Sequence, residues 1–358
     1  MTGKTIVFGL DGACWSIIKP WISEGRLPAF KRFRSEGAWG DLESIPPLTP
    51  PAWTTLTTGL TLQQHMVYSF QRMQPDYSMK PQLNTRKNKR VWDYFEKPCV
   101  LNVPLTYPAI DNKGVMVSGM MSPSLDEKSV QPASEINTLK ELGYVIEPPV
   151  RWQACLESLE KRIDAARAYL ERDFDLYFIV FREFDPVKHY FFDKTLLLYE
   201  KMDGFLGEVM EQHPDANILL VSDHGFARIN RIFVIKNWLI ENGYLKQEES
   251  PGEGRVKTRI KRFAKKNYLD RYIPAKIREK LASSEPAKTR EKKIPGSPVF
   301  AGGWGEIFIN SQDRFTHGLV GENNKQALVK EIMEGLRKVR DGDTPAVKHV
   351  LEFNDTGL

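Results

Sequence analysis

The sequence predicts an α/β protein whose sheet is covered by helices on both faces. Short β-branched and aromatic runs alternate along the chain with longer amphipathic stretches, which is the pattern of strands connected by helices. Because the short runs have the composition of buried strands, we expect helices on each side of the sheet. The 358 residues, 41% of them hydrophobic, suffice for one large domain or two smaller ones.

Six runs are predicted as strands and two as helices. The strands are residues 6–10, 99–103, 115–118, 176–181, 217–221 and 307–310. The clearest helix is 152–172, where apolar residues recur every three or four positions, and 196–212 is a second. We find no repeat of fixed period.

Composition and charge exclude several classes of protein. Charged residues make up 27% of the chain, which excludes a disordered or fibrous protein. The net charge of +5 is too small on its own to indicate a nucleic-acid partner, and no specific nucleic-acid motif occurs. The three cysteines form no CxxC pair, so we expect neither a disulfide framework nor a zinc ribbon.

The sequence also predicts no transmembrane segment, because no run of about eighteen apolar residues occurs. The N-terminus lacks a basic stretch followed by a long apolar run, since the first apolar run ends at Asp11. A cytoplasmic protein is therefore expected.

Residues 255–293 depart from this composition. They hold 15 Lys and Arg but four Asp and Glu, a local net charge of +11. Turn-forming residues flank them, so we predict a basic, partly helical insertion at 251–294 in a core formed by 1–250 and 295–358. Two interpretations stay open: a solvated helical face, or contact with an anionic substrate, phospholipid or nucleic-acid surface.

Acidic and imidazole side chains follow three predicted strands. Asp11 directly follows the first strand, and Asp185 comes four residues after another. Asp223 and His224 follow a third, and His189 shares a helix face with Asp185. Ligands of open α/β sheets bind beyond the carboxyl ends of the strands, so these groups should converge. They would repel one another without a cation, which favours a zinc or manganese site.

Each residue also has a plain structural explanation. Asp11 before a glycine is typical of a turn, and Asp185 would serve as the N-cap of a helix beginning at Pro186. A lone histidine is more often a hydrogen-bonded structural residue. Taken together, however, Asp-Gly, Asp-x-x-x-His and Asp-His-Gly at successive strand ends favour the metal site.

Thr49 is the candidate nucleophile. It precedes two prolines and is expected near a helix start, where backbone N–H groups and the helix dipole favour an anion such as phosphate. A threonine hydroxyl bound to a metal loses its proton more easily and can attack phosphorus. The alternative is a Pro-braced turn in which Thr49 is the helix N-cap.

These motifs resemble the type I phosphodiesterase/nucleotide pyrophosphatase branch of the alkaline phosphatase superfamily, and more narrowly its microbial predicted phosphohydrolases or phosphomutases. The segments that carry the resemblance are 7–13 (VFGLDGA), 46–54 (PPLTPPAWT), 102–108 (NVPLTYP), 181–189 (FREFDPVKH), 221–226 (VSDHGF) and 303–310 (GWGEIFIN). The resemblance implies an alkaline-phosphatase-like central sheet that is mostly parallel. It covers nearly the whole chain outside the basic segment.

The resemblance also implies a site with two divalent metal ions. Zinc is the expected metal, and manganese is the alternative. By position, Asp11, Asp223 and His224 would bind one metal, while Asp185 and His189 would bind the other. The metals would activate Thr49, which would attack a phosphate ester and form a phospho-threonine intermediate.

The chain departs from the family pattern at two places. Ala52 stands where the nucleotide pyrophosphatases have an asparagine, and neither His317 nor His349 has the context of the third histidine of the second metal site. We predict a metal-dependent phosphohydrolase. Two alternatives stay open: a degenerate or truncated relative that binds an anionic surface or partner, and a phosphomutase or phosphotransferase at the same site.

Overall fold

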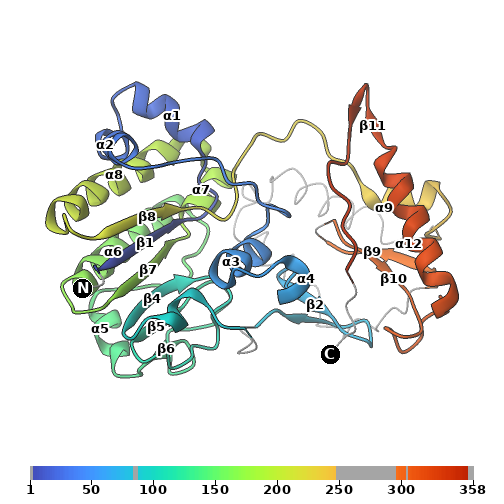
Figure 1. The fold of residues 1–358 in the computed structure, drawn as a ribbon, viewed down its shortest axis with the longest axis horizontal. Coiled ribbons are helices and arrows are strands. Elements are labelled where there is room, and N and C mark those ends of the chain that lie inside the picture. Colours follow the sequence, from blue (N-terminus) through green and yellow to red (C-terminus); the bar gives the residue numbers. More distant parts are fainter. Residues whose placement is uncertain (1–2, 84–87, 247–295, 304, 354–358) are drawn as a thin grey trace, which may run out of the picture. The chain divides into compact units, whose positions relative to one another are not determined.

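The computed structural model describes residues 3–83, 88–246, 296–303 and 305–353. The chain divides into two compact units (Figure 1). The first comprises Met1–Arg72 and Lys80–Asn230, and the second comprises Met73–Met79 and Arg231–Leu358. This boundary after residue 230 was not predicted. The predicted insertion at 251–294 lies outside the described residues, so the division into core and insertion stays a prediction.

The first unit is built around a six-stranded sheet in the order β6–β5–β4–β7–β1–β8 (Figure 1). Its strands are β1 (Thr5–Leu10), β4 (Pro98–Val103), β5 (Val115–Ser118), β6 (Val130–Gln131), β7 (Leu176–Phe181) and β8 (Asn217–Val221). Neighbouring strands run parallel except β5 and β6, which are antiparallel. The predicted alkaline-phosphatase-like, mostly parallel sheet is confirmed, and five of the six predicted strands form it.

The sixth predicted strand belongs to another sheet. β10 (Ile307–Ile309) pairs antiparallel with β9 (Val299–Ala301) in the second unit, and its residues are only half-buried. The expectation of a buried strand was wrong for β10 and also for the edge strand β8, whose residues are half-buried or exposed. A short apolar run does not reveal how completely other elements will cover it.

Helices cover both faces of the main sheet, as the side chains of β1 illustrate. Ile6 and Phe8 lie in a core shared with helices on one face, whereas Val7 packs with Trp53 of a helix on the other. The helices of the first face include α1 (Trp15–Ser23), α2 (Pro28–Glu36), α5 (Glu135–Glu141), α6 (Trp152–Leu170) and α8 (Thr195–Gln212), and the second face carries α3 (Thr49–Thr58). Both predicted helices are confirmed as α6 and α8.

The described chain has further elements, which belong to both units. They are α4 (Leu62–His65), β2 (Gln71–Met73), β3 (Met79–Pro81), the 3-10 helices η1 (Val91–Tyr94) and η2 (Phe192–Lys194), α7 (Phe184–Tyr190), α9 (Ile235–Glu241), α12 (Glu322–Arg337), β11 (Arg340–Asp341) and β12 (Thr344–Pro345). In the part of the chain that the structure describes, no helix has the length and hydropathy needed to cross a membrane.

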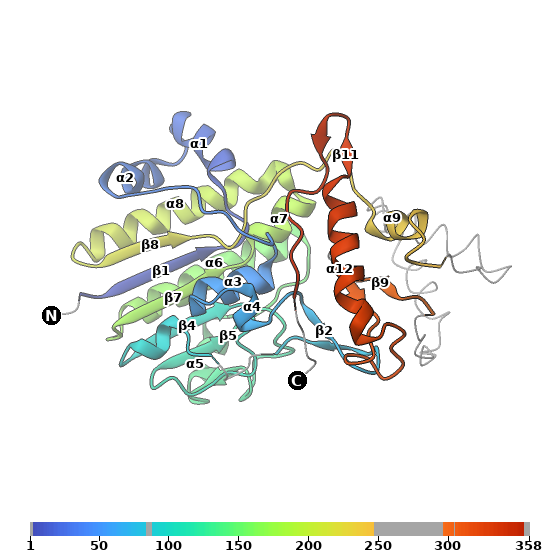
Figure 2. The ribbon, with the colours of Figure 1, turned by 45° about the vertical axis from the view of Figure 1, so that its right-hand side comes forward.

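The second unit has its own small core. Ile332 and Leu336 of α12 pack with Leu239 of α9 and Val299 of β9, and Figure 2 shows these elements side by side. The tip of the β2–β3 hairpin joins this unit because Tyr77 stacks on Phe315, with 4.9 Å between ring centroids, and donates a hydrogen bond to Asn310 Oδ1 at 2.9 Å.

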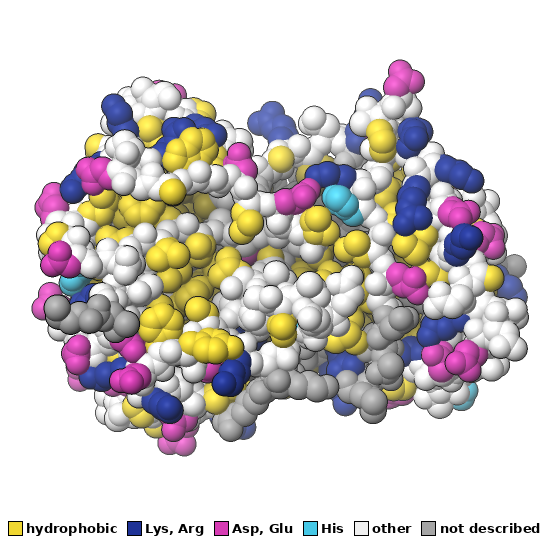
Figure 3. All heavy atoms as spheres, in the orientation of Figure 1, with side chains coloured by type: hydrophobic (Ala, Val, Ile, Leu, Met, Phe, Trp, Pro, Cys, Tyr) yellow, Lys and Arg dark blue, Asp and Glu magenta, His cyan; other side chains and the backbone are white. Residues whose placement is uncertain are grey.

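Charges of both signs are interspersed on the described surface. On the face shown in Figure 3, Lys and Arg side chains lie among Asp and Glu side chains rather than gathering by sign. The basic residues 255–293 lie outside the described residues, and the rest of the chain is slightly acidic.

Candidate functional site

Three adjacent strands bring the predicted site residues to one edge of the sheet. β1 lies between β7 and β8, and all three run parallel (Figure 1). Asp11 directly follows β1, Asp223 and His224 follow β8, and Asp185 lies in α7 just after β7. Because parallel strands end at the same edge, residues far apart in the sequence meet there.

His224 Nε2 lies at the centre of this group. It is 3.3 Å from Asp223 Oδ2, 3.6 Å from Asp11 Oδ1 and 3.2 Å from the Thr49 hydroxyl oxygen. The other ring nitrogen, Nδ1, donates a hydrogen bond to the Gly225 carbonyl at 2.9 Å. Neutral histidine carries one N–H, so this bond leaves Nε2 with a free lone pair.

Two carboxylate oxygens face this lone pair. Asp11 Oδ1 and Asp223 Oδ2 are buried, and neither accepts a hydrogen bond from any described residue. The other Asp223 oxygen accepts the Gly12 N–H at 3.0 Å. Buried carboxylate oxygens without partners are costly, and a divalent cation would satisfy both of them.

The donor set therefore fits a metal ion. Among the described residues, Asp11, Asp223 and His224 form the one group of potential ligands whose donor atoms lie within 4.8 Å of one another. Carboxylate oxygens and imidazole nitrogen suit zinc or manganese. The predicted convergence of these residues is what the structure shows, while their role as metal ligands is a proposal.

Burial and mutual repulsion raise the pKa of both carboxyl groups. For Asp11, burial is the largest cause and the charges of Asp223 and Asp185 add to it, so its pKa lies well above the usual range. Burial raises the pKa of Asp223 to about 7, although the backbone N–H of Gly12 opposes this shift. A cation bound here would displace protons from these groups.

Thr49 is the first residue of α3. Leu48 is the N-cap, and prolines follow Thr49 in the first turn, where a missing N–H costs little. The Thr49 side chain is buried and its hydroxyl reaches His224 Nε2 instead of capping the helix. The alternative that Thr49 is the N-cap is wrong.

Asp185 and His189 form a neighbouring pair on α7. His189 Nε2 lies 3.3 Å from Asp185 Oδ1, one helical turn apart. α7 begins at Phe184 with Glu183 as its N-cap, so the alternative that Asp185 caps a helix beginning at Pro186 is wrong. Within the described chain, this pair does not belong to the group of three ligands.

Sequence reasoning missed Lys188, the residue before His189. Its side chain is buried, with 2% of its surface exposed, and Nζ donates a hydrogen bond to the backbone carbonyl of Asp11 at 3.1 Å. Burial lowers the pKa of Lys188 to about 8, against the opposing effect of the Asp185 and Asp11 charges. The spacing Asp-x-x-Lys could have signalled it, because residues three apart share a helix face.

Two glycines make room for this arrangement. Gly12 has a φ of +68°, and a methyl group there would lie 3.2 Å from both His224 Cε1 and Lys188 Nζ. A methyl group at Gly9 would lie 2.4 Å from the Trp53 ring. Trp53 comes one turn after Thr49 in α3, and its Nε1 is 3.5 Å from Asp11 Oδ2, a contact that the sequence did not predict.

A comparison with known protein families identifies the family of this chain. Residues 5–305 match the family model described as type I phosphodiesterase / nucleotide pyrophosphatase. The chain belongs to this family. The resemblance inferred from the motifs is thus confirmed.

Solved structures show the same fold. Phosphonoacetate hydrolase from Sinorhizobium meliloti 1021 in complex with phosphonoformate is similar with a TM-score of 0.53 and 18% identity, covering 67% of this chain and 62% of that chain. Its complex with phosphonoacetate gives the same TM-score and identity, covering 68% and 62%. This chain therefore spans about three fifths of that hydrolase. No curated protein matches the sequence.

A buried ion pair holds the start of α7, the helix that carries Asp185 and His189. Arg162 of α6 donates a hydrogen bond from Nε to Glu183 Oε1 at 2.9 Å, and each side chain is 1% exposed. Ser158 donates to the same oxygen at 2.6 Å. Glu183 precedes α7 by one residue, so this pair fixes the helix against the core.

Replacing Arg162 by Met is expected to lower the free energy of unfolding by about 3–5 kcal/mol, because it leaves the Glu183 carboxylate buried without its partner. Urea denaturation measures this. Arg167→Met is the matched control on α6, since Arg167 pairs with Glu208 at the exposed surface and should cost about 1 kcal/mol or less. Equal losses for both variants would contradict the prediction.

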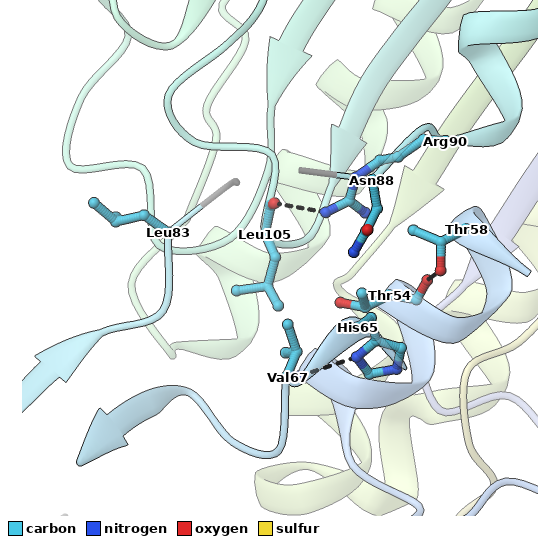
Figure 4. A pocket seen from close by; sticks show the side chains of 8 residues that line it. All are labelled: Thr54, Thr58, His65, Val67, Leu83, Asn88, Arg90 and Leu105. Carbon is cyan, nitrogen blue, oxygen red and sulfur yellow. Dashed lines mark hydrogen bonds between the residues drawn. The ribbon is translucent and has the colours of Figure 1, made fainter. Parts of the chain in front are cut away.

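A small separate cavity lies at the C-terminal end of α3 (Figure 4). It is lined by Thr54, Thr58, His65, Val67, Leu83, Asn88, Arg90 and Leu105. Arg90 donates to the Leu105 carbonyl at 3.4 Å, and His65 Nδ1 accepts the Val67 N–H at 3.0 Å. With a volume of about 10 Å³ it has room for about one water molecule.

Proposed function

We propose that the chain is a metal-dependent hydrolase of phosphate esters with Thr49 as its nucleophile. The observation that supports this best is the convergence of the Thr49 hydroxyl and two unpaired carboxylate oxygens on His224 Nε2. Membership of the type I phosphodiesterase/nucleotide pyrophosphatase family supports the reaction class.

Asp11, Asp223 and His224 would hold the cation. The hydrogen bond from His224 Nδ1 to the Gly225 carbonyl keeps Nε2 available as a ligand. When bound, a divalent cation lowers the pKa of a hydroxyl and polarises phosphoryl oxygens. Zinc is proposed first and manganese as the alternative, because the donor set suits both.

Thr49 would carry the covalent step. Its oxygen gives up its proton and forms a bond to phosphorus while the bond to the ester oxygen breaks, and the leaving alcohol takes up a proton in exchange. Water then attacks the phosphorus of the phospho-threonine: its oxygen leaves with the phosphate product, and one of its protons restores the Thr49 hydroxyl. Because Thr49 begins α3, the helix dipole favours the negative charge of the phosphoryl group at this end.

The predicted second ion rests on Asp185 and His189. These are two protein donors, whereas catalytic zinc sites usually have three. We therefore place the proposed cation at Asp11, Asp223 and His224. Contact of residues 255–293 with an anionic surface stays a prediction.

Hydrolysis of bis-p-nitrophenyl phosphate tests the proposal. Removal of divalent ions with EDTA is expected to lower the rate by about 100-fold or more, because the carboxylates then lack the cation that activates Thr49. Adding zinc or manganese back should restore the rate.

The result also separates the alternatives. Full activity in EDTA would contradict metal dependence. A new phosphate ester formed with an added alcohol would indicate a phosphotransferase or phosphomutase. No turnover with any metal, in a chain that still binds zinc, would indicate a degenerate relative with a binding role.

A further inference from the structure

We infer that the Lys188 ammonium is the second positive charge of this site, and that the described residues hold one divalent cation instead of two. The inference deepens the proposed function and rests on it. Its basis is that Lys188 lies between the ligand group and the pair that would otherwise hold a second ion.

The position of Lys188 follows from three distances around Gly12. A methyl group on Gly12 would lie 3.2 Å from Lys188 Nζ, 3.2 Å from His224 Cε1 and 3.4 Å from Asp185 Oδ1. The position of this methyl group is therefore close to the Lys188 ammonium, to the ligand group and to the Asp185–His189 pair. Since Lys188 Nζ also donates to the Asp11 carbonyl at 3.1 Å, it is fixed at this junction.

Formal charges support one cation. When all four side chains are ionised, Asp11, Asp185 and Asp223 contribute three negative charges at this edge, and Lys188 contributes one positive charge. One divalent cation makes the sum zero, whereas two would leave an excess of two positive charges. Excess charge in a buried site is unfavourable, and a second ion would also repel the ammonium.

The ligands available to a second ion also support a single cation. Asp185 Oδ1 and His189 Nε2 already contact each other at 3.3 Å, and the His189 side chain is half exposed. Among the described residues of the first unit, no third donor completes a group with them. An ammonium needs no such ligands, because it is covalently attached to α7.

The metal content of the full chain tests this inference without any activity measurement. We would dialyse the protein against zinc, remove loosely bound ions by gel filtration and count zinc by mass spectrometry. One ion per chain is expected in the unchanged protein and in Asp185→Asn, and none in Asp223→Asn. Two ions in the unchanged chain would overturn the inference while leaving the proposed function intact, whereas none would overturn the proposed function.

Lys188→Gln gives a second, electrostatic readout. Removing one positive charge should raise zinc affinity by about tenfold and lower the affinity of the zinc-loaded chain for inorganic phosphate by about tenfold. Calorimetric titration measures both.

Lys194→Gln, a control in η2, should change neither affinity. A lysine with a purely structural role would not shift the two affinities in opposite directions, so parallel changes or none would overturn the inference. If Lys188→Gln does not fold, loss of the ion in Asp185→Asn would still overturn it.

Discussion

Thr49→Ala is expected to lower the turnover of bis-p-nitrophenyl phosphate by about 1,000-fold or more, while the chain keeps its zinc. The size of the effect follows from the loss of the only atom proposed to bond to phosphorus, and nucleophile removal has effects of this order in other hydrolases. Zinc should stay because Asp11, Asp223 and His224 are unchanged. Steady-state kinetics and metal analysis of the same sample measure the two outcomes.

Thr49→Ser is the matched control. Serine keeps a hydroxyl at the first residue of α3, so part of the turnover should remain. Unchanged turnover in Thr49→Ala would show that the nucleophile lies elsewhere. Loss of zinc together with turnover would show that Thr49 contributes mainly as a ligand.

Asp223→Asn should abolish zinc binding and turnover together. The amide can still accept the Gly12 N–H through its oxygen, as Asp223 Oδ1 does at 3.0 Å. It removes the negative charge and the second oxygen, which faces His224 Nε2 at 3.3 Å. We expect zinc affinity to fall by about 100-fold or more. Losing a charged ligand should lower the affinity more than losing a residue that only hydrogen-bonds to a ligand.

Asp203→Asn separates this effect from general destabilisation. Asp203 is also a buried carboxylate, and it accepts the backbone N–H groups of Ala29 and Phe30 at 3.1 and 2.8 Å. It lies in α8 and is not part of the ligand group. The variant should therefore lose stability but keep its zinc. Equal zinc loss in both variants would contradict the role of Asp223.

Periodicity and strand-end residues predicted the parts of the site that depend on local sequence. The strands before Asp11 and Asp223 are continuous apolar runs, and parallel strands necessarily end at one edge. The start of α3 at Thr49 could likewise be predicted, because prolines favour the first turn of a helix.

What the sequence did not predict depends on tertiary contacts. Lysine is mostly an exposed residue, so the burial of Lys188 becomes visible only once α7 packs against α6 and α8 and Lys188 reaches the Asp11 carbonyl. The contact of Trp53 with Asp11 needs the absence of a side chain at Gly9. The sheet that β10 joins is decided by its partner β9, and no local pattern specifies that partner.

The central position of β1 has a consequence for the order of folding. β1 pairs with β7 on one side and with β8 on the other, and the hydrogen bond between Gly12 and Asp223 joins residues 211 positions apart. During synthesis the N-terminal strand must wait for most of the first unit to emerge before its two neighbours exist, and such long-range pairing is slow. A nascent chain that ends before residue 223 has no Asp223 or His224. The proposed cation site is thus completed at the end of assembly, and bound metal would report that the sheet is complete.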